Sequence, residues 1–225
     1  MDVLITGGEQ GLGKAILDQL KPDRITNIRG NDIIHAYNMD EMKALADDIV
    51  GESGPFDIII NNFGTNHLSW IGTTPKSDAY IMEANVMLPY WIINAAVKWE
   101  RPCRVLNISS MTYRVPQRCT SLYCASKAAL SQMTKVMARE LAPKGWQINA
   151  FAPGKILGTR MTAMVDAQVL DLRGWEREDA DEYAKGLVPM GRFMLLEEAA
   201  DIAVYTLTAP SYINGTTIEA FGGLY

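Results

Sequence analysis

The chain has 225 residues, of which 48% are hydrophobic, and this is enough apolar material for one substantial core but not for two independent domains. Its formal net charge of −5 and its pI near 5.1 argue against a nucleic-acid-binding surface, so we expect a small-molecule partner. The three cysteines form neither an even disulfide framework nor a Cys-x-x-Cys pair, which fits a reducing compartment, and we predict no metal site.

Nothing in the sequence predicts export or membrane insertion. Strand-like sequence starts at Asp2, which leaves no room for a signal peptide, and no apolar run reaches the roughly 18 residues of a membrane span. We therefore expect a cytoplasmic protein that does not contact a membrane.

Short apolar or β-branched runs alternate along the chain with longer segments of helical period, which is the pattern of parallel βαβ units. Most runs lack polar alternation, so both faces of the sheet should be covered by helices. Strands are predicted at residues 3–6, 24–28, 32–37, 56–61, 104–109, 147–152 and 216–220, and helices near 12–20, 39–50, 77–99, 120–143 and 196–208. The sequence thus predicts a single α/β domain over residues 1–225, with about seven strands in a doubly wound parallel sheet.

The segment from Lys155 to Phe193 breaks this alternation. It is rich in methionine and charged residues, contains four glycines and has no strand pattern. We interpret residues 155–193 as a helical excursion that forms a lid over a substrate.

The first strand runs directly into a glycine-rich turn and a helix, in the sequence VLITGGEQGLGKAI. Glycine allows positive φ angles and lets a pyrophosphate approach the backbone, while the start of the helix offers unpaired N–H groups and a partial positive charge. This order of elements indicates an anion-binding turn. A tight turn without a ligand is the alternative that the glycine spacing by itself leaves open.

This turn resembles the glycine pattern TGxxxGxG of the classical short-chain dehydrogenase/reductase family. A second family marker, Asn-Asn-Ala-Gly after the fourth strand, is present here as NNFG, with phenylalanine in place of alanine. The resemblance implies a Rossmann-like fold that binds a nicotinamide dinucleotide. The residues that it assigns to cofactor binding in these two motifs are Thr6, Gly7, Gly11, Leu12, Gly13, Asn62 and Gly64.

The stretch SLYCASKAAL places Tyr123 and Lys127 four residues apart, on one face of a predicted helix. Ser110 precedes Tyr123 by 13 residues, as in the family's Ser–Tyr–Lys set, and Asn85 matches the fourth member of that set. The resemblance implies that Tyr123 exchanges a proton with a carbonyl or alcohol oxygen, that Ser110 hydrogen-bonds this oxygen, and that Asn85 holds a water in a relay to Lys127.

The same resemblance implies that Tyr123 and Lys127 also contact the cofactor ribose. Because a nearby cation lowers the pKa of a phenol, we expect Lys127 to make Tyr123 more acidic. For each residue taken singly, a structural role remains an alternative: a strand-end cap for Ser110, a backbone contact for Asn85 and an exposed helix pair for Tyr123 and Lys127.

After the sixth predicted strand, FAPGKILGTRM resembles the family's Pro-Gly turn. The resemblance implies that the nicotinamide end of the cofactor meets Pro153, Gly154, Ile156 and Thr159, although Thr159 stands one residue further along than usual. The C-terminal sequence resembles family members that associate as dimers or tetramers. We therefore expect a homodimer or a homotetramer.

The end of the second predicted strand should select the dinucleotide, because an acid there suits the ribose 2′-hydroxyl and an arginine suits a 2′-phosphate. The sequence has Arg29 at this point, with Lys14 as a second cation, so it favours NADP(H) over NAD(H). The resemblance also places Asn38 and Met39 beside the adenine.

The connection after the second strand is unusually short. Only Arg29, Gly30 and Asn31 separate the second and third predicted strands, whereas a parallel crossover needs a dozen residues or more. We expect either a shortened second crossover or an antiparallel hairpin, and either would weaken the preference for NADP(H).

Taken together, these motifs predict an NAD(P)-dependent oxidoreductase that transfers a hydride between nicotinamide and a carbonyl or alcohol substrate. The resemblance is strongest to NADPH-dependent carbonyl and 3-oxoacyl-thioester reductases. An NAD-dependent alcohol dehydrogenase and a non-catalytic dinucleotide-binding or structural subunit are the alternatives. An apolar substrate pocket, or alternatively core packing, is predicted for Trp70, Tyr113, Met161, Met164, Trp175 and Met190.

Overall fold

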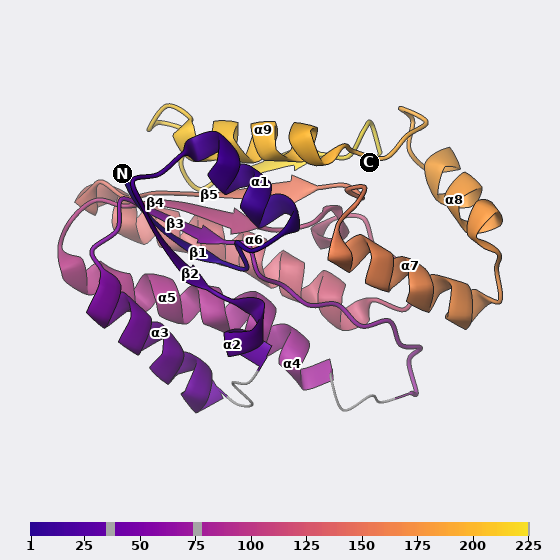
Figure 1. Cartoon of the computed structure of the whole chain (residues 1–225), viewed down its shortest axis with the longest axis horizontal. Coiled ribbons are helices and arrows are strands. Elements are labelled where there is room, and N and C mark those ends of the chain that lie inside the picture. Colours follow the sequence, from indigo (N-terminus) through magenta and orange to yellow (C-terminus); the bar gives the residue numbers. More distant parts are fainter. Residues whose placement is uncertain (35–38, 74–77, 225) are drawn as a thin grey trace.

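The structure is a computed structural model that describes residues 1–34, 39–73 and 78–224. In these residues, six strands form one parallel sheet in the order β2-β1-β3-β4-β5-β6. The strands are β1 Asp2–Thr6, β2 Arg24–Ile28, β3 Ile58–Asn61, β4 Arg104–Ile108, β5 Gln147–Pro153 and β6 Thr217–Ala220. Helices cover both faces of the sheet (Figure 1), so the predicted doubly wound α/β fold is confirmed.

The helices are α1 Gly11–Leu20, α2 Gly30–Ile34, α3 Met39–Ser53, α4 Asp78–Met82, α5 Leu88–Ala96, α6 Ser121–Leu141, α7 Arg160–Arg173, α8 Arg177–Gly186 and α9 Leu196–Thr208. Of these, α1, α3, α6, α9 and the segment from α4 to α5 follow the helix ranges that the apolar periodicity predicts. A π-helical turn, Glu83–Met87, joins α4 to α5, and short 3-10 turns span Val97–Trp99, Met111–Tyr113 and Ala142–Lys144.

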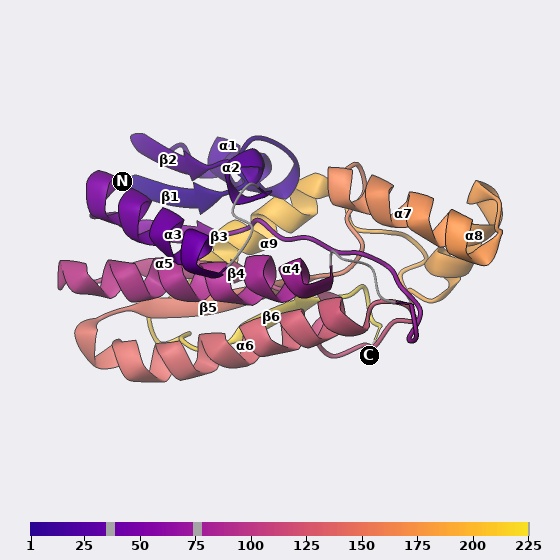
Figure 2. The same cartoon turned by 90° about the horizontal axis from the view of Figure 1, so that it is seen from below.

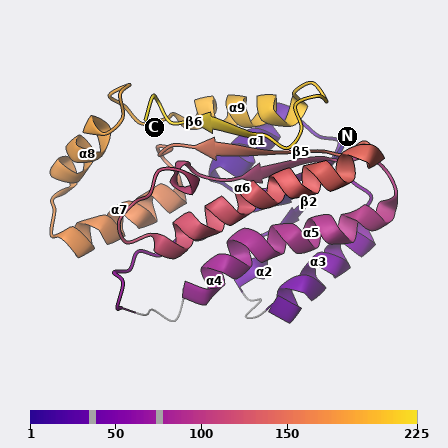
Figure 3. The same ribbon diagram turned by 180° about the vertical axis from the view of Figure 1, so that it is seen from behind.

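Two apolar layers sandwich the sheet, because successive side chains of a strand point to opposite faces. In β1, Leu4 packs into the layer formed with α3, α5 and α6, whereas Val3 and Ile5 pack into the layer formed with α1 and α9. Figures 2 and 3 show α3, α5 and α6 together on one face, and Figure 1 shows α1 and α9 on the other. All seven residues of β5 are buried, so the centre of the sheet is well covered on both faces.

The strand predicted at 32–37 is wrong over the residues that the structure describes, since Gly30–Ile34 is helical and residues 35–37 lie outside the described ranges. The Asp32 carboxylate accepts a hydrogen bond from the Arg29 backbone N–H at 3.1 Å, and the Ile33 N–H donates to the Arg29 carbonyl. A Gly-Asn-Asp sequence favours such a turn over an extended strand, because the short polar side chains bond to the nearby backbone.

The connection after β2 therefore takes neither of the two predicted forms. The chain passes through α2 and α3 and enters β3, which pairs in parallel with β1. In the common order 3-2-1-4-5-6, a further strand lies outside the second one. Among the described residues β2 is the edge of the sheet, and most of its residues are exposed or half-buried.

The segment 155–193 forms helices α7 and α8, which extend beyond the carboxyl ends of the strands (Figure 1). An isolated bridge between Ile156 and Met194 joins the two ends of this segment. In the described ranges, no helix has both the length and the apolar character that a membrane span requires.

Candidate active site

A cavity of about 1530 Å³ lies at the carboxyl ends of the strands. Its walls come from the glycine turn after β1, the loops after β3, β4 and β5, the start of α6, and helices α7 and α8. Ligands of doubly wound sheets bind at this edge, where the helix N-termini and the loops converge. Two motifs that lie far apart in the sequence, the glycine turn and the Tyr–Lys pair, therefore line one cavity.

The glycine turn is built as tightly as its sequence predicts. The Gly7 N–H donates to the Ile28 carbonyl at 2.8 Å, and Gly7 and Gly11 have φ angles of +66° and +54°, where side chains are rarely tolerated. A Cβ atom at Gly13 would lie 2.5 Å from the Gly7 carbonyl oxygen. Helix α1 starts at Gly11 without a side-chain cap, so its first N–H groups are available at the cavity.

The predicted asparagine loop supports this turn. Asn62 Nδ2 donates to the Thr6 and Gly7 carbonyls at 3.0 and 2.8 Å, and Thr6 Oγ1 accepts the backbone N–H groups of Asn62 and Phe63. Gly7, Gly11, Leu12, Asn62 and Gly64 line the cavity, whereas Thr6 and Gly13 lie behind it and hold the backbone in place. The uncrowded glycine backbone and the unpaired helix N–H groups fit a pyrophosphate, so the residues present suit a dinucleotide.

Asn85 lies in the π-helical turn between α4 and α5, a local distortion that is frequent at functional sites. It is fully buried, and its side chain accepts from the Thr65 N–H and donates to the Thr65 carbonyl and to Ser126 Oγ. A Cβ atom on Gly64 would lie 3.2 Å from Asn85 Oδ1 and 3.3 Å from Lys127 Nζ. Asn85 is thus placed behind the cavity wall and fixes the loop in front of Lys127.

Lys127 is buried in α6, and its Nζ donates to the Ile108 carbonyl at the end of β4, at 2.9 Å. Burial lowers the pKa of Lys127 to about 8, because the ammonium loses hydration. The ammonium lies 5.7 Å from the centre of the Tyr123 ring, as the four-residue spacing predicts.

Tyr123 is 7% exposed and lines the cavity, with its hydroxyl 3.9 Å from Met161 Sδ. Burial raises the pKa of Tyr123 to about 12, and hydrogen bonding with Ser110 opposes this rise. The expectation that Lys127 makes Tyr123 more acidic is therefore not met in this structure. The loss of water around the phenolate outweighs the other effects, and the ammonium donates to a backbone carbonyl instead.

Ser110 lies at the end of β4 and caps the 3-10 turn Met111–Tyr113, where its Oγ accepts the Thr112 N–H at 3.3 Å. It also lines the cavity beside Tyr123. Ser110 therefore caps this turn and also lines the cavity, so the structural role and the predicted position at the site are compatible in one side chain.

The loop after β5 brings Pro153, Gly154, Ile156 and Thr159 to the cavity. Thr159 Oγ1 accepts the Thr162 N–H at 3.1 Å and caps α7. A Cβ atom on Gly11 would lie 3.8 Å from Thr159, so the extra residue before Thr159 does not remove it from the glycine turn.

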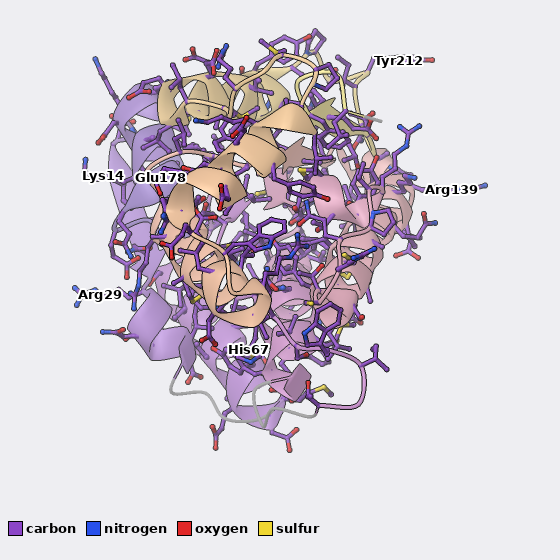
Figure 4. The ribbon with its side chains drawn as sticks, turned by 90° about the vertical axis from the view of Figure 1, so that its right-hand side faces the viewer. Lys14, Arg29, His67, Arg139, Glu178 and Tyr212 are labelled. Atoms are coloured by element: carbon purple, nitrogen blue, oxygen red, sulfur yellow. The ribbon has the colours of Figure 1, made fainter. Side chains whose placement is uncertain are left out.

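The residues predicted for the adenosine end are not brought to the cavity. Arg29, Lys14 and Met39 are not part of its described lining, and Figure 4 shows the Arg29 and Lys14 side chains extending away from the molecule. Asn38 lies outside the described residues. Glu9, Gln10, Gly30 and Asn31 line this end instead. Glu9 and Gln10 stand between the motif glycines, and their polar side chains were a signal for this end of the cavity that the sequence prediction did not use.

The predicted substrate residues divide into two groups. Met161, Met164, Trp175 and Met190 line the cavity, together with other apolar side chains of α7. Trp70 and Tyr113 do not line it: Trp70 is largely exposed, and the Tyr113 hydroxyl donates to Glu219. In the described part of the chain, no cluster of three His, Cys, Asp or Glu side chains is placed to hold a metal ion.

Fold and cleft together define the class of the protein, a dinucleotide-dependent α/β oxidoreductase. The family model for short chain dehydrogenases matches residues 33–170, and the chain belongs to this family. The chemistry of the family is hydride transfer between NAD(P) and a carbonyl or alcohol group.

Two relatives are similar over almost their whole length. The chain is 29% identical to 3-oxoacyl-[acyl-carrier-protein] reductase FabG of Haemophilus influenzae, over 99% of this chain and 97% of the relative. It is 30% identical to acetoacetyl-CoA reductase of Rhizobium meliloti, with the same coverage. Both alignments run over more positions than this chain has residues, so both relatives contain segments that this chain lacks.

Among solved structures, a short chain dehydrogenase family protein from Francisella tularensis has a TM-score of 0.84 with 21% sequence identity. The superposition covers 99% of this chain and 97% of that chain. The two chains therefore share the same fold.

Proposed function

We propose that this chain is a carbonyl reductase for an apolar oxo substrate of the 3-oxoacyl-thioester type. When bound, the reduced nicotinamide supplies the hydride, which goes to the carbonyl carbon. Tyr123 donates its phenolic proton to the carbonyl oxygen, and Ser110 donates a hydrogen bond to the same oxygen as negative charge develops on it. The products are an alcohol and the oxidised dinucleotide.

The observation that carries this proposal is the buried Tyr123 phenol at the cavity wall, beside Ser110 and one helical turn from Lys127. Burial raises the pKa of Tyr123 to about 12, so the phenol carries a proton at neutral pH that it can donate to a carbonyl oxygen. In the reverse reaction the same hydroxyl would take up a proton, so the pKa does not by itself set the direction. The reductive direction is supported by the names of the two relatives, both of which are reductases.

Lys127 and Asn85 act behind the reacting atoms in this proposal. The pKa of Lys127 is lowered to about 8 by burial, so this side chain exchanges a proton more readily than an exposed lysine does. Asn85 positions the loop of Gly64 and Thr65 that borders Lys127. The completeness of this set speaks against a non-catalytic subunit.

The substrate class is supported by the walls of the cavity. Met161, Met164 and Met111 line the cavity, and Met161 Sδ lies 3.9 Å from the Tyr123 hydroxyl; methionine adapts to flexible apolar chains. The two named relatives reduce 3-oxoacyl and acetoacetyl thioesters according to their names. Neither Arg29 nor Lys14 is part of the described cavity lining, so the proposed reductase takes its hydride from NADH or NADPH.

We also propose that residues 155–193 form the wall of the substrate half within the single domain. Gln168 Oε1 of α7 accepts the Leu68 N–H at 2.8 Å, and Asp166 pairs with Lys155 at 2.8 Å and with Arg177 at 3.1 Å. These contacts tie α7 to the loop after β3, to the loop after β5 and to α8. Replacement of Gln168 by alanine should raise the KM of the substrate about fivefold and leave dinucleotide affinity unchanged, since one hydrogen bond is worth about 1 kcal/mol. Steady-state kinetics with Gln19→Ala as the control checks this, and an unchanged KM would contradict the proposed wall.

The main test begins with a titration of the protein with NADPH and with NADH, followed by energy transfer from its five tryptophans to the reduced nicotinamide. A screen of 3-oxoacyl thioesters and simple ketones then measures the loss of reduced nicotinamide. Tyr123→Phe should keep dinucleotide binding and lose about 10²- to 10⁴-fold in turnover, because it lacks the proton donor.

The matched control is Tyr212→Phe, which removes the same hydroxyl from a fully exposed side chain that points away from the molecule (Figure 4). This variant should have wild-type turnover. If Tyr123→Phe turned over at the wild-type rate, the proposed mechanism would be wrong.

The association into a homodimer or homotetramer stays a prediction. Light scattering of the purified protein would check it.

A further inference from the structure

The adenosine end of the cavity contains a carboxylate that the family motif does not supply. Glu9 lies between the glycines of the turn, and its Oε1 accepts the Gly30 backbone N–H at 3.1 Å. Glu9, Gly30 and Asn31 all line the cavity. The hydrogen bond therefore holds the Glu9 carboxylate against the residues that directly follow β2.

This position matters for the choice of dinucleotide. In folds with a glycine turn of this kind, an acidic residue at the end of the second strand accepts a hydrogen bond from the ribose 2′-hydroxyl of NAD, whereas an arginine there receives the 2′-phosphate of NADP. In this chain the strand-end residue itself is Arg29, whose side chain extends into solvent (Figure 4) and is not part of the cavity lining.

The second candidate cation is also directed elsewhere. Lys14 Nζ pairs with Asp18 at 2.7 Å on the outer surface of α1, and Lys14 is not part of the cavity lining. Arg29 contributes its backbone N–H to Asp32. Of Glu9, Lys14 and Arg29, only Glu9 is thus part of the described cavity lining.

We propose that Glu9 takes the place of the strand-end acid and makes the cleft select NAD(H) against NADP(H). This inference rests on the dinucleotide binding of the proposed function. Glu9 Oε2 has no hydrogen-bond partner among the described residues, so it is suited to accept from a ribose 2′-hydroxyl. A 2′-phosphate carries a charge of about −1.5 to −2 at pH 7, and the carboxylate repels it at close range.

The sequence prediction of NADP(H) is reversed by this inference for a physical reason. A cation selects a phosphate only if its side chain can reach it, and the path of the chain after β2 turns Arg29 away. The turn into α2 also presents the Gly30 N–H, which orients the Glu9 carboxylate.

The experiment compares binding rather than turnover. Wild type, Glu9→Gln, Glu178→Gln and Arg29→Ala are each titrated with NADH and NADPH, followed by energy transfer from tryptophan and by calorimetry. The wild type should bind NADH at least about tenfold more tightly than NADPH, and Glu9→Gln should lose about tenfold of this ratio through tighter binding of NADPH. The amide oxygen of glutamine can still accept the Gly30 N–H, so the variant removes the charge and keeps the structural bond.

The control variant Glu178→Gln removes the same charge from the exposed start of α8, outside the cavity lining, and it should keep the wild-type ratio. Arg29→Ala should also keep that ratio. A wild type that prefers NADPH, a selective loss of NADPH binding in Arg29→Ala, or an unchanged ratio in Glu9→Gln would each overturn the role of Glu9 while the proposed reductase stands. Failure of every variant to bind either nucleotide would instead overturn the proposed function, and the inference with it.

Discussion

The two ends of the cleft differ in how firmly the fold holds them. At the catalytic end, Asn85, Tyr123 and Lys127 are buried, and Asn85 and Lys127 are bonded to backbone groups of the loops around them. At the adenosine end, Glu9 and Arg29 are exposed, and β2 is an edge strand with two exposed residues. The difference teaches that burial fixes a polar side chain, because a buried polar group must find its partners, whereas an exposed one can bond to water.

The largest effect is expected at the glycine turn, which joins the two ends. In Gly13→Ala the new Cβ would meet the Gly7 carbonyl at 2.5 Å, and backbone cannot move aside cheaply. We expect a loss of about 3 kcal/mol in the free energy of unfolding and of about 100-fold in dinucleotide affinity. Urea denaturation and nucleotide titration measure both.

The control for this variant is Gly51→Ala in α3, where an added Cβ meets nothing within 4 Å. Alanine is the better helix former, so this variant should gain about 0.5–1 kcal/mol in stability. If Gly13→Ala were as stable as Gly51→Ala and bound dinucleotide normally, the turn would not be the rigid element that the geometry indicates.

A smaller effect, at the buried end, is expected from the titration of Lys127. Burial lowers its pKa from 10.5 to about 8. At a pH between these two values, Lys127 is therefore protonated in the unfolded chain and neutral in the folded chain. The contribution of Lys127 to the free energy of unfolding therefore increases as the pH rises from about 8 to 10.5. Relative to Lys127→Met, the wild type should gain about 3 kcal/mol in the free energy of unfolding between pH 7 and pH 10.5.

Urea denaturation of both proteins at several pH values measures this difference. Tyr123 is present in both, so its own titration largely cancels. A difference that does not change with pH would mean that Lys127 is hydrated like an exposed lysine, and the contrast between the two ends would be lost.

The smallest effect is expected at the open end. Asp32→Ala removes the carboxylate that accepts the Arg29 N–H, but Asp32 is exposed, and water replaces the lost bond. We expect a loss of no more than about 1 kcal/mol. The same denaturation experiment, with Asp18→Ala on exposed α1 as the control, checks it; a loss above about 2 kcal/mol would show that the two ends are held equally firmly.

Sequence reasoning was most accurate where a local pattern and burial agree. The four-residue spacing of Tyr123 and Lys127 on α6 fixes their shared face, and Gly7 and Gly11 of the turn have the positive φ angles that only glycine adopts easily. Most of the longer elements also follow the predicted ranges, since apolar periodicity dictates which face is buried.

Sequence reasoning failed where several local outcomes have similar energy. The apolar residues after Asp32 fit a strand or a helix, and the Asp32 side chain favours the helical turn. The same turn directs Arg29 outwards and brings Gly30 to Glu9. No periodicity in the sequence encodes these directions, because they follow from the path of the backbone.

By itself, the sequence determined the class of fold, the glycine turn and the set of residues at the candidate catalytic end, since spacing along strands and helices carries that information. Only the tertiary structure decided the electrostatics of the cleft. It placed Tyr123 where burial raises the pKa of its phenol to about 12, and it left the Glu9 carboxylate rather than the Arg29 guanidinium at the adenosine end. Charge and solvation depend on which groups come together in space, and these groups are far apart in the sequence.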